Sequence, residues 1–161
     1  MPTTYTLDQV FDMAQIAERN GARFYRKAAS NMKVPALQKL LLDLASMEDA
    51  HFQVFEALRK QLSDAERDIA ITDNVEGSYF WLRALAGGYA FDFRSDPSAL
   101  LTGKETLSHI LHKAILLERD AIVFYSAIRQ RMSQGVEKLD VIIRQEMKHV
   151  TQLSEELAAI Q

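Results

Sequence analysis

The 161 residues contain no cysteine. This excludes disulfide bonds, cysteine-ligated zinc and iron–sulfur clusters, and leaves carboxylate and imidazole groups as the strong metal ligands. The sequence also has no run approaching the ~18 uninterrupted apolar residues of a membrane-spanning helix. Residues Met1 to Thr6 lack the basic and apolar regions of a signal peptide. We therefore expect a cytoplasmic protein without a membrane segment.

Positive charge is not in excess either, since the formal net charge is −3. Nothing in this balance favours nucleic acid as a partner. Apolar residues make up 48% of the chain and charged residues 25%, as in ordinary globular proteins. The length suits one domain over residues 1–161, large enough to bury a core without disulfide or metal staples.

One pattern of metal-ligating residue types occurs twice. A glutamate is followed, on what is predicted to be the next long helix, by a Glu-x-x-His motif. Residues three apart lie on the same face of a helix, so each motif presents a carboxylate and an imidazole together. The predicted metal ligands are Glu18, Glu48, His51, Glu118, Glu146 and His149.

The single glutamates also begin two matching octets, residues 18–25 and 118–125, which share Glu, Arg, Phe and Tyr at the same offsets. This indicates an internal duplication. Tyr25 and Tyr125 lie two turns from their glutamates on the same face, about 10 Å along the axis. Each could pack in the core with a satisfied hydroxyl or donate a second-shell hydrogen bond to a carboxylate, and the matched pair gives the second role equal weight.

Four long helices are predicted from capping signals and periodicity near 3.6 residues. A capping box at Thr6–Gln9 opens the first, and Pro35 suits the first turn of the second. The expected helices run from Thr6 to about Ala29, from Pro35 to Leu62, from a capping box at Thr102–Glu105 to about Met132, and from about Val136, after a stop at Gly135, to Ala159.

The segment between the helix pairs, about 63–103, reads as a long crossover with short helical pieces, beginning with a capping box at Ser63–Glu66. An aromatic run at Tyr79–Leu82, with Phe91 and Phe93, suggests burial there or at the interface of a homodimer. Two antiparallel helix pairs joined by one long crossover give an all-α, ferritin-like four-helix bundle.

The predicted ligands lie within apolar stripes, so four carboxylates would point into the core. Burying them without cations is very unfavourable. Two divalent cations would balance the four charges, and oxygen and imidazole donors suit iron, with manganese as the alternative. A single Glu-x-x-His motif is usually a solvated edge or a satisfied core pair, but two complete, matched halves favour a dinuclear centre. His109 and His112 lie off the face of Glu118, and we expect them at the surface or in contact with the crossover, not among the ligands.

At these residues the sequence resembles the rubrerythrin branch of the ferritin-like superfamily. The resemblance implies a non-haem di-iron centre held by the six predicted ligands, with Tyr25 beside it, in a protein related to oxidative stress. Rubrerythrins carry a further glutamate where this chain has Ala121, and a four-cysteine rubredoxin domain that these residues do not include.

The resemblance implies an oxidoreductase that reduces peroxide or dioxygen with electrons from an external donor protein. Three alternatives remain open. The protein could be a ferroxidase that handles ferrous iron, a di-manganese catalase-like enzyme, or a structural bundle whose metal site is not catalytic.

Overall fold

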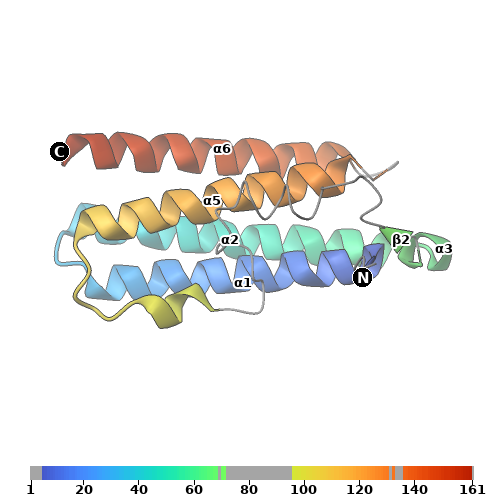
Figure 1. Cartoon of the computed structure of the whole chain (residues 1–161), viewed down its shortest axis with the longest axis horizontal. Coiled ribbons are helices and arrows are strands. Elements are labelled where there is room, and N and C mark those ends of the chain that lie inside the picture. Colours follow the sequence, from blue (N-terminus) through green and yellow to red (C-terminus); the bar gives the residue numbers. More distant parts are fainter. Residues whose placement is uncertain (1–4, 69, 72–95, 131, 133–135, 161) are drawn as a thin grey trace, which may run out of the picture.

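The computed structural model describes residues 5–68, 70–71, 96–130, 132 and 136–160. Four long helices lie side by side along one axis (Figure 1). Their bounds are α1, Leu7–Asn31; α2, Pro35–Gln61; α5, Leu107–Arg129; and α6, Val136–Ala159. In Figure 1, α1 and α2 run antiparallel, as do α5 and α6, whereas α2 and α5 run in the same direction. The fold is therefore a ferritin-like four-helix bundle made of two helical hairpins.

Short elements lie at the ends of the bundle. The first hairpin is followed by α3 (Asp64–Arg67) and the second is preceded by the 3₁₀ helix η1 (Pro97–Leu100). Strand β1 (Tyr5–Thr6) pairs antiparallel with β2 (Ala70–Ile71), which joins the beginning of α1 to the chain after α3. The aromatic run predicted at 79–82, Phe91, Phe93 and the predicted stop at Gly135 lie outside the described residues.

Capping chemistry explains where the first helices begin. Thr6 and Gln9 form the predicted capping box of α1, and Ser63 and Glu66 form that of α3. Pro35 is in the first turn of α2, where its missing N–H costs no intrahelical hydrogen bond. The predicted bounds of α1, α2 and α6 are confirmed to within two residues.

The predicted beginning of the third helix was wrong. Thr102 Oγ1 accepts a hydrogen bond from Lys104 N, two residues on, and so closes a turn. Gly103 has φ of 82°, in the left-handed region, which a right-handed helix cannot contain. Helix α5 instead begins at Leu107, and Thr106 is its N-cap, accepting from His109 N. It ends at Arg129, three residues before the predicted Met132.

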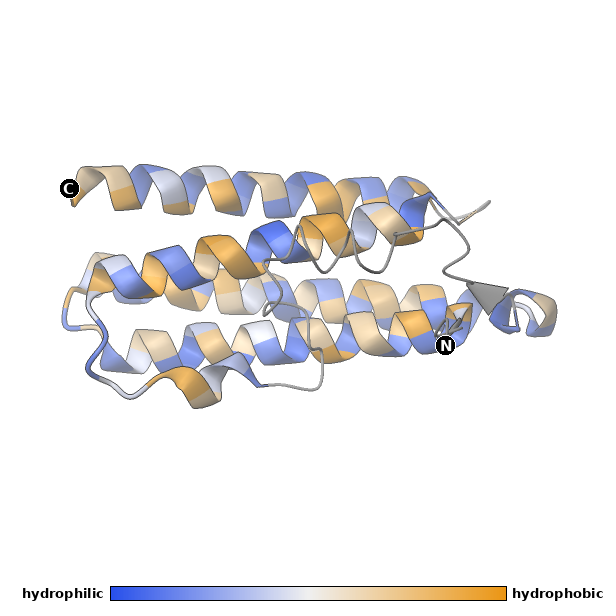
Figure 2. Ribbon diagram, viewed as in Figure 1, coloured by the Kyte–Doolittle hydropathy of each residue, from blue (hydrophilic) through white to orange (hydrophobic). Residues whose placement is uncertain are grey.

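The buried core is divided into two apolar clusters, one toward each end of the bundle. Figure 2 shows apolar residues recurring along each long helix. On every long helix the predicted ligands lie, in sequence, between the members of the two clusters. A polar layer therefore crosses the middle of the bundle. Large members of one cluster are Phe24, Tyr25, Leu41, Leu111 and Leu153, and of the other Phe11, Phe55, Tyr125, Leu139 and Ile142.

Candidate metal centre

All four long helices contribute to the polar layer. The first hairpin supplies three predicted ligands and the second supplies the other three, and none of the six is more than 6% exposed. The apolar stripes on either side bury these helix faces and carry the polar side chains into the core with them. The sequence therefore placed all six residues correctly on the inner faces: Glu18, Glu48, His51, Glu118, Glu146 and His149.

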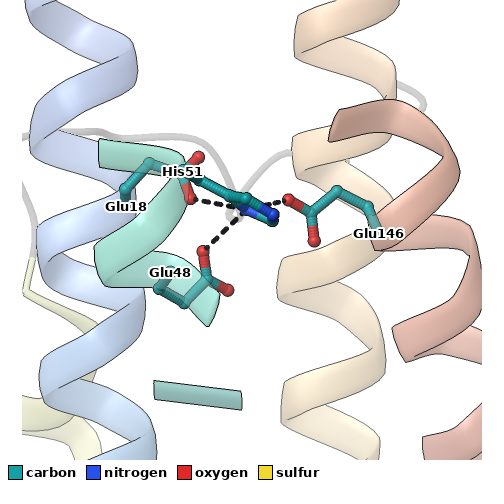
Figure 3. A group of neighbouring side chains, drawn as sticks. All are labelled: Glu18, Glu48, His51 and Glu146. Atoms are coloured by element: carbon teal, nitrogen blue, oxygen red, sulfur yellow. Dashed lines mark ion pairs between the residues drawn. The ribbon is translucent and has the colours of Figure 1, made fainter. Parts of the chain in front are cut away.

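The first group of donors is centred on His51 (Figure 3). Its Nδ1 lies 2.8 Å from Glu146 Oε1, 3.3 Å from Glu18 Oε2 and 3.7 Å from Glu48 Oε2. One donor atom from each of these four residues lies within 4.8 Å of the others, close enough to hold one metal ion. Three of the residues come from the first hairpin and Glu146 comes from the second.

The second group is centred on His149 and has the opposite composition. His149 Nδ1 lies 3.0 Å from Glu146 Oε2 and 3.5 Å from Glu118 Oε2. Together with Glu48, their donor atoms lie within 4.8 Å of one another. Glu48 and Glu146 belong to both groups, so two adjacent ions would share them. The sequence indicated six ligands but not which two are shared.

The polar atoms at the centre lack hydrogen-bond partners. Five such buried atoms belong to the cluster: Glu18 Oε2, His51 Nδ1, both carboxylate oxygens of Glu146, and His149 Nδ1. The histidine nitrogens are within ion-pair distance of the carboxylates, but no contact among these atoms has hydrogen-bond geometry. Buried polar atoms are normally satisfied. Atoms that converge unsatisfied, with only oxygen and nitrogen donors, fit a pair of hard or borderline divalent cations.

Without a metal ion the cluster retains protons. Burial, with the nearby charge of Glu146, raises the pKa of Glu118 to about 8. Burial and the charge of Glu48 also raise the pKa of Glu18 well above its usual range. Burial alone lowers the pKa of His149, but its contacts with Glu118 and Glu146 outweigh this effect and raise the pKa to about 10. In the metal-free protein, bound protons therefore offset the negative charge of the carboxylates.

Tyr25 reaches the centre from α1. Its hydroxyl group donates a hydrogen bond to Glu118 Oε1, on the other hairpin. Tyr125 differs from the sequence prediction, because its buried hydroxyl has no hydrogen-bond partner. Its ring packs instead in the apolar cluster, with its centroid 4.9 Å from that of Phe55. The matched tyrosines of the two octets thus have different contacts.

The outer nitrogen of each histidine contacts a residue that sequence reasoning missed. His51 Nε2 lies 2.8 Å from Gln145 Oε1, and His149 Nε2 lies 3.3 Å from Met47 Sδ. A signal was present, since Met47 and Gln145 immediately precede the glutamates of the two Glu-x-x-His motifs.

His109 and His112 remain outside the cluster, as predicted. Both are exposed on α5, and His112 Nδ1 lies 2.8 Å from the carbonyl oxygen of Ser108, on its own helix. Neither is near enough to the six predicted ligands to join either group.

Comparison with known proteins gives one sequence match and one match of fold. Residues 9–84 match the sequence model of the Rubrerythrin family, a region that includes nearly all of α1, the whole of α2 and three of the predicted ligands. Over these residues the chain is similar to rubrerythrins. No curated protein sequence matches it significantly.

The fold of the chain also matches a crystal structure from Thermotoga maritima, described as that of a ferritin-like diiron-carboxylate protein. The match covers 97% of both chains, with a TM-score of 0.77 and 23% sequence identity. At this identity the likeness supports the fold. Among the described residues, no helix is long and apolar enough to cross a membrane.

Proposed function

We propose that this rubrerythrin-like protein is a di-iron oxidoreductase that reduces hydrogen peroxide or dioxygen with electrons from an external donor. The observation that carries the proposal is the pair of four-residue donor groups that share Glu48 and Glu146 in a buried layer. Carboxylates shared in this way would hold two ions close together. When bound, an iron pair supplies two one-electron changes, which match the two electrons and two protons that convert hydrogen peroxide to two water molecules.

Each residue of the centre has a distinct part in this proposal. Glu48 and Glu146 would contribute to holding both ions, with Glu18 and His51 completing one group and Glu118 and His149 the other. The apolar clusters above and below the layer limit the access of bulk water. The Tyr25 hydroxyl holds a proton at Glu118 Oε1 and so orients that carboxylate.

The electrons must come from elsewhere. The 161 residues have no cysteine and so contain no four-cysteine iron centre of the rubredoxin type. The position where rubrerythrins carry a further glutamate is Ala121, which packs partly buried against the apolar cluster of Phe55 and Tyr125. The centre proposed here therefore uses six protein ligands.

Metal analysis and rapid mixing test the proposal. Protein purified without oxygen should contain about two iron ions per chain. After reduction, stopped-flow mixing with peroxide and, separately, with dioxygen should show oxidation of the iron pair by at least one of the two. His149→Ala should lose much of the metal, whereas His109→Ala, which changes an exposed histidine of α5, should retain it.

Three outcomes would contradict the proposal. Metal content near zero after growth with ample iron and manganese would exclude a dinuclear centre. Manganese in place of iron, with disproportionation of peroxide, would identify a catalase-like enzyme. Repeated oxidation of added ferrous iron by dioxygen, with slow reaction toward peroxide, would identify a ferroxidase.

A further inference from the structure

The two histidines of the centre have similar inner surroundings and different outer ones. Both are 2% exposed, both direct Nδ1 toward the carboxylates, and their rings stack with centroids 6.0 Å apart. Each position has the shared Glu48 and Glu146 and one further glutamate. The ligand sets are therefore chemically alike, and a difference between the positions must come from what surrounds the ligands.

The outer contacts are made across the hairpins at matching sequence positions. Gln145, on α6, contacts His51 on α2, and Met47, on α2, contacts His149 on α6. Gln145 and Met47 each precede the glutamate of their own Glu-x-x-His motif. The internal duplication has therefore kept the position of this contact but changed its chemistry from an amide oxygen to a thioether sulfur.

This change affects how well each imidazole can bind a cation. A histidine that binds metal through Nδ1 must carry its proton on Nε2, and an acceptor at Nε2 fixes that tautomer and makes Nδ1 more basic. The amide oxygen of Gln145 is a strong acceptor, whereas a thioether is a weak one. Loss of such an outer partner typically lowers metal affinity about 10- to 100-fold.

We propose that Met47 makes the metal position of Glu118 and His149 the weaker and more readily exchanged of the two. The inference rests on the proposed function only in that the cluster holds two metal ions. The position of Glu18 and His51 fills first, and the position beside Met47 fills second. Met47 acts as a positioning residue through His149 and does not itself bind the metal.

A second asymmetry provides the competing explanation. The Tyr25 hydroxyl donates to Glu118, whereas the Tyr125 hydroxyl has no partner. A donated hydrogen bond draws charge from a carboxylate, so Tyr25 could also weaken the position of Glu118. Tyr25→Phe removes this contact while leaving Met47 in place, and it therefore serves as the control.

The experiment titrates metal-free protein with Co²⁺, followed by calorimetry and by visible absorption of the bound ion. Wild-type protein should bind two ions in steps that differ about 10- to 100-fold in affinity. Met47→Gln, which preserves side-chain length and supplies an amide, should tighten the second step toward the first. Gln145→Met should weaken the first step, and Met47→Leu should leave the second step weak. The metal-free melting temperatures verify that each variant folds.

Nitrogen NMR of the histidine rings adds a separate readout at each Nε2–H group. In zinc-loaded protein, the His51 Nε2–H proton should exchange slowly with solvent, and that of His149 should exchange faster. Met47→Gln should slow the exchange at His149 and leave that at His51 unchanged.

Two equal binding steps in the wild type would overturn the inference, as would an unchanged second step in Met47→Gln. If Tyr25→Phe and not Met47→Gln removes the difference in affinity between the two binding steps, Tyr25 causes that difference. This result would also overturn the inference about Met47. Absence of Co²⁺ binding would defeat this inference and the proposed function together. Two unequal steps closed by Met47→Gln, in a protein whose iron form reacts with neither peroxide nor dioxygen, would support the inference and defeat the proposed function.

Discussion

Gly21 provides the space that the shared Glu48 carboxyl group occupies. A Cβ atom at this position would lie 3.3 Å from Glu48 Cδ and 3.4 Å from its Oε1. Gly21→Ala should therefore displace Glu48 and weaken both metal positions at once. The metal-free protein should be affected less, because the preference for alanine over glycine within a helix, ~1 kcal/mol, offsets part of the cost of displacing Glu48. Thermal melts with and without Co²⁺ test this prediction, and an undiminished metal-induced shift would contradict it.

Asp120 is a buried carboxylate that takes no part in the metal centre. It is 2% exposed, neither carboxylate oxygen has a hydrogen-bond partner, and Arg119 lies 3.7 Å away. Burial raises the pKa of Asp120 to about 6, and the charge of Arg119 only partly opposes this effect. Above that pH the folded protein must bury a charge.

Asp120→Asn should therefore stabilise the protein at pH 8 and have little effect at pH 4. The raised pKa means that the folded protein holds a proton that the unfolded chain releases, so stability falls as pH rises from about 4 to about 6. Urea unfolding at the two pH values measures the effect. Asp43→Asn, at an exposed aspartate, is the control, and a pH-independent effect at Asp120 would show that its charge is unimportant.

The sequence was most informative about features that depend on a single helix, such as the face on which a side chain lies. All six predicted ligands lie on inner faces because helical periodicity and the apolar stripes place them there. The sharing of Glu48 and Glu146, and the contacts of Met47 and Gln145, depend on distances between the hairpins. Those distances follow from packing and have no local sequence signal.

The residue that caps helix α5 can be identified by mutation. Thr106 is the N-cap, so Thr106→Ala should destabilise the protein by about 1 kcal/mol. Thr102 closes the exposed turn before the helix. Thr102→Ala should therefore destabilise the protein by no more than about 0.5 kcal/mol. Urea unfolding of the two variants compares them. A larger loss for Thr102→Ala would mean that the helix begins at the earlier position.

The wrong prediction at α5 has a physical explanation. Threonine followed three residues later by glutamate suits both a capping box and an isolated turn, and here Glu105 accepts from Thr102 N and Gly103 N within the turn. The positive φ of Gly103 shows that the segment is an isolated turn. Because glycine adopts positive and negative φ about equally well, the residue type alone does not predict the sign of φ. At Thr6, Pro35 and Ser63 the local signals agreed with the packing, so the predicted boundaries were close.

For the whole molecule, the polar layer makes stability dependent on metal and pH together. The pKa of Glu118 is raised from 4.5 to about 8, and that of His149 from 6.5 to about 10. Between the ordinary and the raised pKa of each group, the folded metal-free protein keeps a proton that the unfolded chain loses. The stability of the metal-free protein therefore falls as pH rises through these ranges. Metal binding strengthens over the same range, because ligands must be deprotonated. The difference in melting temperature between metal-bound and metal-free protein should therefore increase from pH 5 to pH 9.

Melting curves at pH 5, 7 and 9, with Co²⁺ or with a chelator, measure this difference. His109→Ala gives a control for a histidine away from the centre, and its curves should follow those of the wild type. A difference in melting temperature that stays constant across the three pH values would argue against protons occupying the centre when metal is absent.

The division of donors between the hairpins has a consequence for synthesis of the protein. A ribosome produces α1 and α2 first, and these helices already carry Glu18, Glu48 and His51, three of the four donors of one group. Glu146, which both groups need, lies on α6 and emerges after the other three long helices. A nascent or broken chain without α6 can complete neither group. Both donor groups are thus complete only in a chain that has been translated through α6.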